Sequence, residues 1–198
     1  VWRDIHAGGF YWAGSLVVGD AVIYGGDNGQ SGDTESGSFL VSRNKYTGEL
    51  LSSLPLTGDQ RSTIAYENGQ VFFTSKTGTL WRADVDATTG QLSGLTSRSY
   101  PEQGNQSVST PVIYDGRVYF TLGNGLGGSG SILAVDAASL ELIWNVEVPA
   151  YPQCSLLLST AYADTGDLYL YATYNGKPGG VKVVQAPTDA AGNGDVTI

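Results

Sequence analysis

Polar and aromatic side chains recur at one place in four similar stretches of the chain. Gln60-Arg61, Asn105-Gln106 and Gln153 each precede a run of apolar residues, and Tyr11-Trp12 takes this place in the first stretch. Amide, guanidinium and aromatic groups brought together can bind a peptide, a sugar or another small polar ligand. The candidate ligand-binding residues are therefore Trp12, Tyr11, Gln60, Arg61, Asn105, Gln106 and Gln153. Alternatively, the repeated Gln side chains only satisfy backbone groups between neighbouring units.

A second candidate site is the acidic loop after the first stretch. Asp27, Asp33 and Glu35 are spread through a segment rich in Gly and Ser. Oxygen ligands in a flexible loop suit a hard cation, so calcium is possible here. Gly29 stands where the third position of an EF-hand loop would need a ligand, and a solvated hairpin loop is the alternative reading.

The composition argues against several other kinds of chemistry. His6 and Cys154 are the only residues of their types, which leaves no disulfide, no cysteine metal cluster and no histidine-rich metal site. His6 lies in a glycine-rich connector without a nucleophile motif, so we expect no hydrolytic triad. A net charge of -9 disfavours nucleic acid. The chain contains no apolar run long enough for a transmembrane segment.

The elements that would position these residues repeat along the chain. Between residues 107 and 148 the sequence predicts four strands with a turn between each pair, and Asp115-Gly116 is a strong hairpin signal. The second strands of four such units align on Val22, Val71, Val118 and Leu168, which are 49, 47 and 50 residues apart. A period of this size with four strands per repeat predicts an all-β propeller of four-stranded antiparallel blades. We place the blades at about 10–56, 57–98, 105–149 and 151–198.

One segment of the third unit resembles a known repeat family. Residues 134–144, AVDAASLELIW, are similar to the A-x-D-x-x-T-G-x-x-x-W signature of PQQ-like repeats, and the segments 86–90 and 44–48 match its D-x-x-T-G part. This family includes quinoprotein dehydrogenases and a bacterial outer-membrane assembly lipoprotein. The resemblance implies that Asp86, Gly90, Asp136 and Trp144 are structural, with the turn linking the third and fourth strands and the Trp filling space between blades.

The resemblance also bears on the size of the ring. Propellers of this family usually have seven or eight blades, so about four blades imply a single propeller segment whose remaining blades come from the parent chain or from a partner. Residues 1–5 are similar to the tail of a fourth strand, as the comparison of Trp2 with Trp144 suggests, and we assign them to a preceding blade. A self-closed four-bladed ring is the alternative.

For function, we expect binding rather than catalysis. Quinone-dependent relatives hold their cofactor over a Trp and under a vicinal disulfide, and a single Cys excludes that pair, so PQQ is not expected. The leading hypothesis is a non-catalytic binding or scaffold domain of an extracellular or envelope-associated bacterial protein, which engages a protein, peptide or glycan through its loops or channel mouth. The alternatives are part of a degenerate quinoprotein-like or other propeller enzyme with its catalytic residues elsewhere, and a purely structural spacer.

Overall fold

The protein is described by a computed structural model that covers residues 1–6, 8–10, 12–28, 38–125 and 127–187. In these residues the chain forms three four-stranded antiparallel sheets and one three-stranded sheet, each with its strands in sequence order. The predicted all-β fold of about four antiparallel blades is thereby confirmed. Among the described residues, no helix is long and apolar enough to cross a membrane.

Each sheet is one blade. The first contains β1 (Leu16–Val18), β2 (Ala21–Gly25), β3 (Ser38–Asn44) and β4 (Leu50–Leu56). The second contains β5 (Ala65–Glu67), β6 (Gln70–Thr74), β7 (Thr79–Val85) and β8 (Leu92–Ser99). The third contains β9 (Val112–Tyr114), β10 (Arg117–Gly123), β11 (Gly130–Asp136) and β12 (Leu142–Val148). The fourth contains β13 (Leu157–Ser159), a short 3₁₀ turn η1 (Ala163–Thr165), β14 (Asp167–Tyr174) and β15 (Gly180–Pro187). The strand expected at 195–198 lies outside the described residues.

The same turn links the third and fourth strands of the first three blades. In the third blade Asp136 Oδ1 accepts hydrogen bonds from the backbone N–H groups of Ala138 (3.0 Å) and Ser139 (2.7 Å), and Asn44 and Asp86 make the equivalent pairs. The turn then needs a left-handed residue, with φ of 78° at Gly48 and 72° at Gly90. The structural role predicted for the D-x-x-T-G turn is confirmed.

Apolar cores lie between blades rather than within them. A single sheet cannot bury both of its faces, so each blade covers its neighbour. The first interface contains Ile23 and Leu40 against Val71 and Phe73, and similar clusters join the second blade to the third and the third to the fourth. Trp144 packs against the cluster between the third and fourth blades, as its predicted structural role requires.

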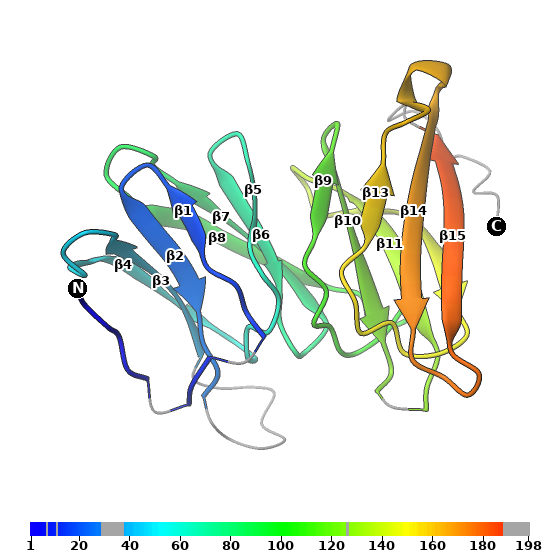
Figure 1. Cartoon of the computed structure of the whole chain (residues 1–198), viewed down its shortest axis with the longest axis horizontal. Helices are drawn as coiled ribbons and strands as arrows, with labels where there is room; N and C mark the ends of the chain where they lie inside the picture. The colour runs from blue at the N-terminus through cyan, green and yellow to red at the C-terminus, as the bar shows by residue number, and fades with distance from the viewer. Residues whose placement is uncertain (7, 11, 29–37, 126, 188–198) are drawn as a thin grey trace.

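The blades follow one another in an arc with the first strands along one face (Figure 1). The first and fourth blades are at opposite ends of this row, and in the part of the chain that the structure describes no backbone pairing joins them. The alternative of a ring closed through such pairing is therefore not observed in these residues.

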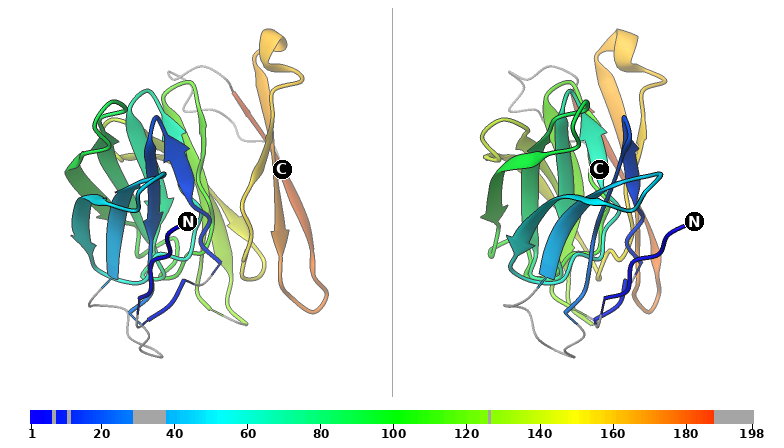
Figure 2. Two further views of the ribbon diagram at one scale, coloured as in Figure 1. Left: turned by 60° about the vertical axis from the view of Figure 1, so that its left-hand side comes forward. Right: turned by 90° about the vertical axis from the view of Figure 1, so that its left-hand side faces the viewer.

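Residues 1–6 form no strand and run along the outside of the first blade (Figure 2). Trp2 Nε1 donates to the carbonyl oxygen of Lys45 (3.0 Å), and Asp4 accepts from the Tyr24 hydroxyl (2.5 Å) and pairs with Arg43 (3.1 Å). The hydrogen bond from Tyr24 lowers the pKa of Asp4, while burial and this carboxylate raise the pKa of Tyr24 to about 12. Trp2 thus occupies the outer face of the first blade, next to the Gly48 turn.

Candidate functional site at the mouth of the concave face

A row of hydrogen bonds joins the segments that precede the first strand of each blade, which we call the blade entrances. The backbone N–H of Gly14 donates to Thr63 Oγ1 (3.1 Å), that of Thr63 to Thr110 Oγ1 (3.0 Å), and that of Thr110 to Ser155 Oγ (3.1 Å). Each acceptor precedes the first strand of the next blade, so the row crosses all four blades. These links fix the blade entrances relative to one another.

Trp12 is held in an unusual conformation at this end of the first blade. Its φ is 57°, a region that non-glycine residues seldom adopt, and 71% of its surface is exposed. The guanidinium carbon of Arg61 lies 5.7 Å from the centroid of its ring. Backbone strain of this kind tends to collect at binding sites, where the surrounding structure holds it in place.

Arg61 is in turn fixed by two buried carboxylates. Its Nε and Nη2 are 2.9 and 2.5 Å from Asp27 Oδ2, and Nη2 is 3.6 Å from Asp59 Oδ2. Asp59 Oδ1 accepts the backbone N–H of Asn28 (2.9 Å). Burial, together with the neighbouring Asp27 carboxylate, raises the pKa of Asp59. Two acids beneath one guanidinium therefore make a rigid, largely desolvated support for Trp12.

A cavity of about 320 Å³ opens beside this support. Its described lining consists of Trp12, Val108 and Gln153, which come from the entrances to the first, third and fourth blades. Gln153 is exposed and its Oε1 accepts a hydrogen bond from Asn175 Nδ2 (3.2 Å). The structure thus brings three of the candidate residues, Trp12, Arg61 and Gln153, close to this cavity. We call the end of the blades that carries the blade entrances the mouth of the concave face.

The other predicted residues lie differently. Gln60 is fully buried, donates from Nε2 to the carbonyl oxygen of Ser62 (2.7 Å), and presses its amide oxygen against Gly25. Gln106 forms a backbone bridge with Gly123, and the neighbouring Asn105 is exposed. Gln60 thus satisfies a backbone carbonyl of its own blade and packs against Gly25 of the first blade, so it does not face the cavity.

Three of the predicted ligand-binding and metal-binding residues belong to segments that the structure does not describe. Tyr11 lies outside the described residues, as do Asp33 and Glu35 of the proposed calcium loop. Asp27, the remaining member of that loop set, is paired with Arg61. Within the described residues, no group of three or more His, Cys, Asp or Glu side chains could hold a metal ion.

Two features of the site were missed in the sequence. Thr63, Thr110 and Ser155 follow one another at intervals of 47 and 45 residues, and a search for hydroxyl residues just before each first strand could have found them. Tyr151, rather than Gln153, makes the fourth blade's counterpart of the Gln60 and Gln106 backbone bridges. In the fourth blade the Gln therefore stands two positions after the residue that forms the backbone bridge, whereas in the second and third blades the Gln itself forms it.

Repeated blades, the Asx-type turn and a Trp between blades define the class of protein, a β-propeller of PQQ-like repeats. Residues 1–156 match the model of the family described as outer membrane protein assembly factor BamB, and the chain belongs to this family. No curated protein sequence matches the chain at a significant level.

Solved structures agree on the fold. BamB from Moraxella catarrhalis superposes with a TM-score of 0.54 at 13% identity, over 90% of this chain and 51% of that one. Quinohemoprotein alcohol dehydrogenase from Comamonas testosteroni gives 0.61 at 17% identity, over 96% of this chain and 34% of that one. The computationally designed Ika4 protein gives 0.58 at 15% identity, over 91% and 92% of the two chains. The chain spans about half the length of that BamB and about a third of that dehydrogenase.

The mouth residues do not fit a quinone cofactor of the PQQ type. That cofactor is an anion with several carboxylates, and the cationic group at the mouth, Arg61, already faces Asp27 and Asp59. Further negative charge beside two buried acids is electrostatically unfavourable.

Proposed function

We propose that this chain is a non-catalytic binding domain of an envelope-associated or extracellular bacterial protein, and that the mouth of its concave face engages the ligand. The observation that carries the proposal is Trp12, an exposed aromatic ring fixed by Arg61 at the rim of a 320 Å³ cavity. Large aromatic side chains at the edge of a pocket are frequent anchors of recognition.

The rigidity of the support favours recognition. Arg61, paired with the buried Asp27 and Asp59, packs on one face of the Trp12 ring, and an anchor that is preorganised in this way loses little conformational entropy when a ligand binds. Membership of the BamB family supports an envelope location, and the name of that family, an outer membrane protein assembly factor, supports a protein partner for the complete molecule.

A ligand-observed NMR screen of the chain against mixed peptides, saccharides and small polar compounds tests the proposal. We expect that some compounds bind the unmodified chain, and that their binding signals disappear when the Trp12→Ala variant replaces it. A parallel sample with PQQ, calcium, an alcohol and a redox dye should show no dye reduction. Dye reduction would favour the enzyme alternative. Ligands whose binding does not depend on Trp12 would contradict the mouth as the binding site, and the absence of any binder would favour the spacer.

A further inference from the structure

We propose that the cavity between Trp12 and Gln153 takes a neutral saccharide, with a sugar ring packed on the Trp12 indole. Since this assignment presupposes that the mouth binds a ligand, it rests on the proposed function and gives that ligand a chemical class.

The indole provides the apolar part of the site. One side of the ring is occupied by Arg61, and 71% of the residue is exposed. A pyranose ring carries C–H groups on its faces, and such a face packs on an aromatic ring through dispersion and burial of apolar surface. The orientation of Trp12 is already set by its backbone and by Arg61, which lowers the entropic cost of this contact.

Gln153 supplies hydrogen-bonding groups to the same cavity. Gln153 lines the cavity together with Trp12. Its amide oxygen accepts from Asn175, and within the part of the chain that the structure describes neither of its side-chain N–H donors is engaged, so both can donate to a ligand oxygen. Outside the described lining, the hydroxyls of Thr63, Thr110 and Ser155 accept backbone N–H groups along the blade entrances, and a hydroxyl that accepts can also donate. Such donors suit a ligand rich in uncharged oxygen atoms.

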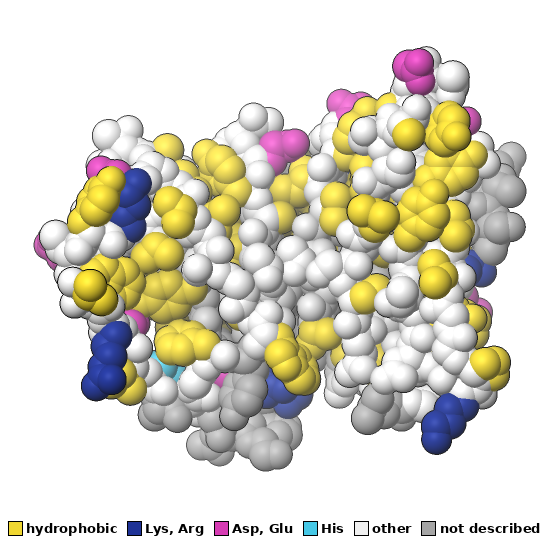
Figure 3. Space-filling view, viewed as in Figure 1, with side chains coloured by type: hydrophobic (Ala, Val, Ile, Leu, Met, Phe, Trp, Pro, Cys, Tyr) yellow, Lys and Arg dark blue, Asp and Glu magenta, His cyan; other side chains and the backbone are white. Residues whose placement is uncertain are grey.

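The distribution of charge disfavours charged small ligands. The described lining residues, Trp12, Val108 and Gln153, are all uncharged, and the middle of this face carries mostly uncharged surface with Lys, Arg, Asp and Glu nearer its edges (Figure 3). Asp27 and Asp59 are at most 1% exposed and are covered by Arg61, so neither presents a carboxylate to a cationic ligand. The net charge of -9 repels anions.

The size of the cavity agrees with a short saccharide. Its volume of about 320 Å³ is at the lower end of the range of roughly 300–1,000 Å³ that is typical of ligand pockets.

Isothermal titration of the chain with maltose, cellobiose and N,N′-diacetylchitobiose tests the proposal. We expect at least one of them to bind, with an affinity that is unchanged between low and high salt because no ion pair forms. Trp12→Ala should weaken binding by about tenfold or more, as truncation of an aromatic anchor does, and Trp12→Phe should restore part of the loss. Tyr46→Ala is the matched control, because Tyr46 is 69% exposed and also has a cation, Lys45 Nζ, 4.9 Å from its ring centroid.

Each outcome decides between the claims. If all three disaccharides fail while an extended peptide from the mixed screen binds in a Trp12-dependent manner, the saccharide assignment is wrong and the proposed binding function stands. If nothing binds at Trp12 in either experiment, both are wrong. Sugar binding that Trp12→Ala and Tyr46→Ala leave equally intact would also overturn the assignment. Equal melting temperatures of the variants establish that each remains folded.

Discussion

The turn glycine Gly90 provides a direct test of how neighbouring blades fit together. It has a φ of 72°, and a Cβ placed on it would lie 2.6 Å from Leu51 Cδ1 and 2.8 Å from Ala21 Cβ, both in the first blade. Gly116 has nearly the same φ, 73°, with nothing within 4 Å of an added Cβ. The pair Gly90→Ala and Gly116→Ala therefore shares the backbone strain and differs in the contact between blades.

The two costs can be estimated separately. A left-handed conformation costs an L-residue roughly 1–2 kcal/mol, which is all that Gly116→Ala should lose. Overpacking of a fitted interior adds about 1–3 kcal/mol, so Gly90→Ala should be less stable than Gly116→Ala by that further amount. The contact atoms are Ala21 Cβ, which cannot rotate away, and a methyl of Leu51, whose backbone oxygen is also bonded to Gln91 Nε2 (2.6 Å).

Urea unfolding of the two variants, followed by circular dichroism, gives the free energies, and an unchanged m-value confirms that the same surface is exposed on unfolding. Equal losses of stability in Gly90→Ala and Gly116→Ala would refute the claim that this turn is packed tightly against the preceding blade.

Further predictions concern the remaining contacts. Because the pKa of Asp59 is raised above its ordinary value of 3.8, the folded state holds this proton more tightly, so stability should fall as pH rises from about 4 through the folded pKa. Asp59→Asn should flatten this slope in urea titrations across pH, and an unchanged slope would contradict the role of burial. Leu140→Ala, which removes a buried side chain but keeps the left-handed turn (φ 59°), should lose about 2–5 kcal/mol by the same unfolding assay. Thr63→Val removes the acceptor for Gly14 and should cost about 1 kcal/mol, whereas Thr57→Val, outside the row, should be close to neutral.

The architecture could be predicted because it is encoded locally and repeated. Alternating apolar residues, the Asp115-Gly116 hairpin and the D-x-x-T-G turn are each specified within a few residues. Because the unit recurs about every 48 residues, the same pattern can be recognised several times along the chain. Leu140 shows the limit of such motifs. It replaces the expected Gly yet adopts the same left-handed φ of 59°, because its side chain is buried between blades and its carbonyl accepts from the Tyr100 hydroxyl (2.7 Å).

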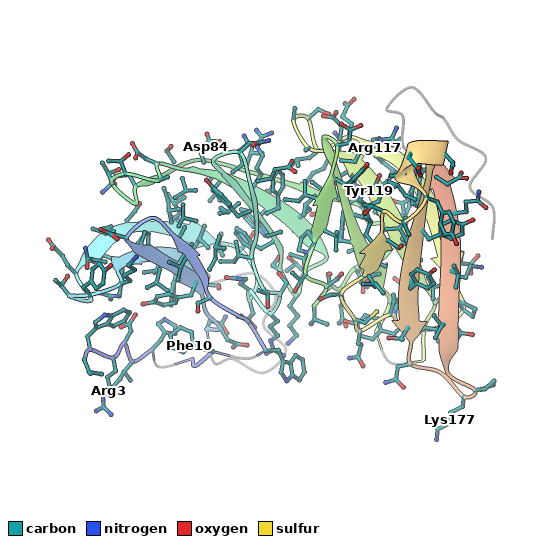
Figure 4. All side chains as sticks on the ribbon, turned by 45° about the horizontal axis from the view of Figure 1, so that its top comes forward. Arg3, Phe10, Asp84, Arg117, Tyr119 and Lys177 are labelled. Carbon is teal, nitrogen blue, oxygen red and sulfur yellow. The ribbon has the colours of Figure 1, made fainter. Side chains whose placement is uncertain are left out.

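The site was less predictable because it depends on long-range geometry. Gln60 and Arg61 are adjacent in sequence, but one is buried against Gly25 and the other reaches Asp27 and Trp12 from the adjoining blade. Interior polar groups such as Arg117 and Tyr119 on β10 gave no sequence signal either (Figure 4). Which neighbour a polar side chain faces is set by the packing of blades, and no local pattern records it.

The response of the Trp12 indole to a ligand decides whether the mouth is the binding site. The four indole N–H signals of the ¹⁵N-labelled chain, from Trp2, Trp12, Trp81 and Trp144, can be assigned by single Trp→Phe substitutions. On titration with the ligand that binds, the signal of Trp12 should move in a saturable manner, while that of Trp81, which is 7% exposed in the core between the first two blades, should stay in place. A saturating ligand that leaves the Trp12 signal unmoved and shifts another would contradict the assignment of the mouth as the binding site.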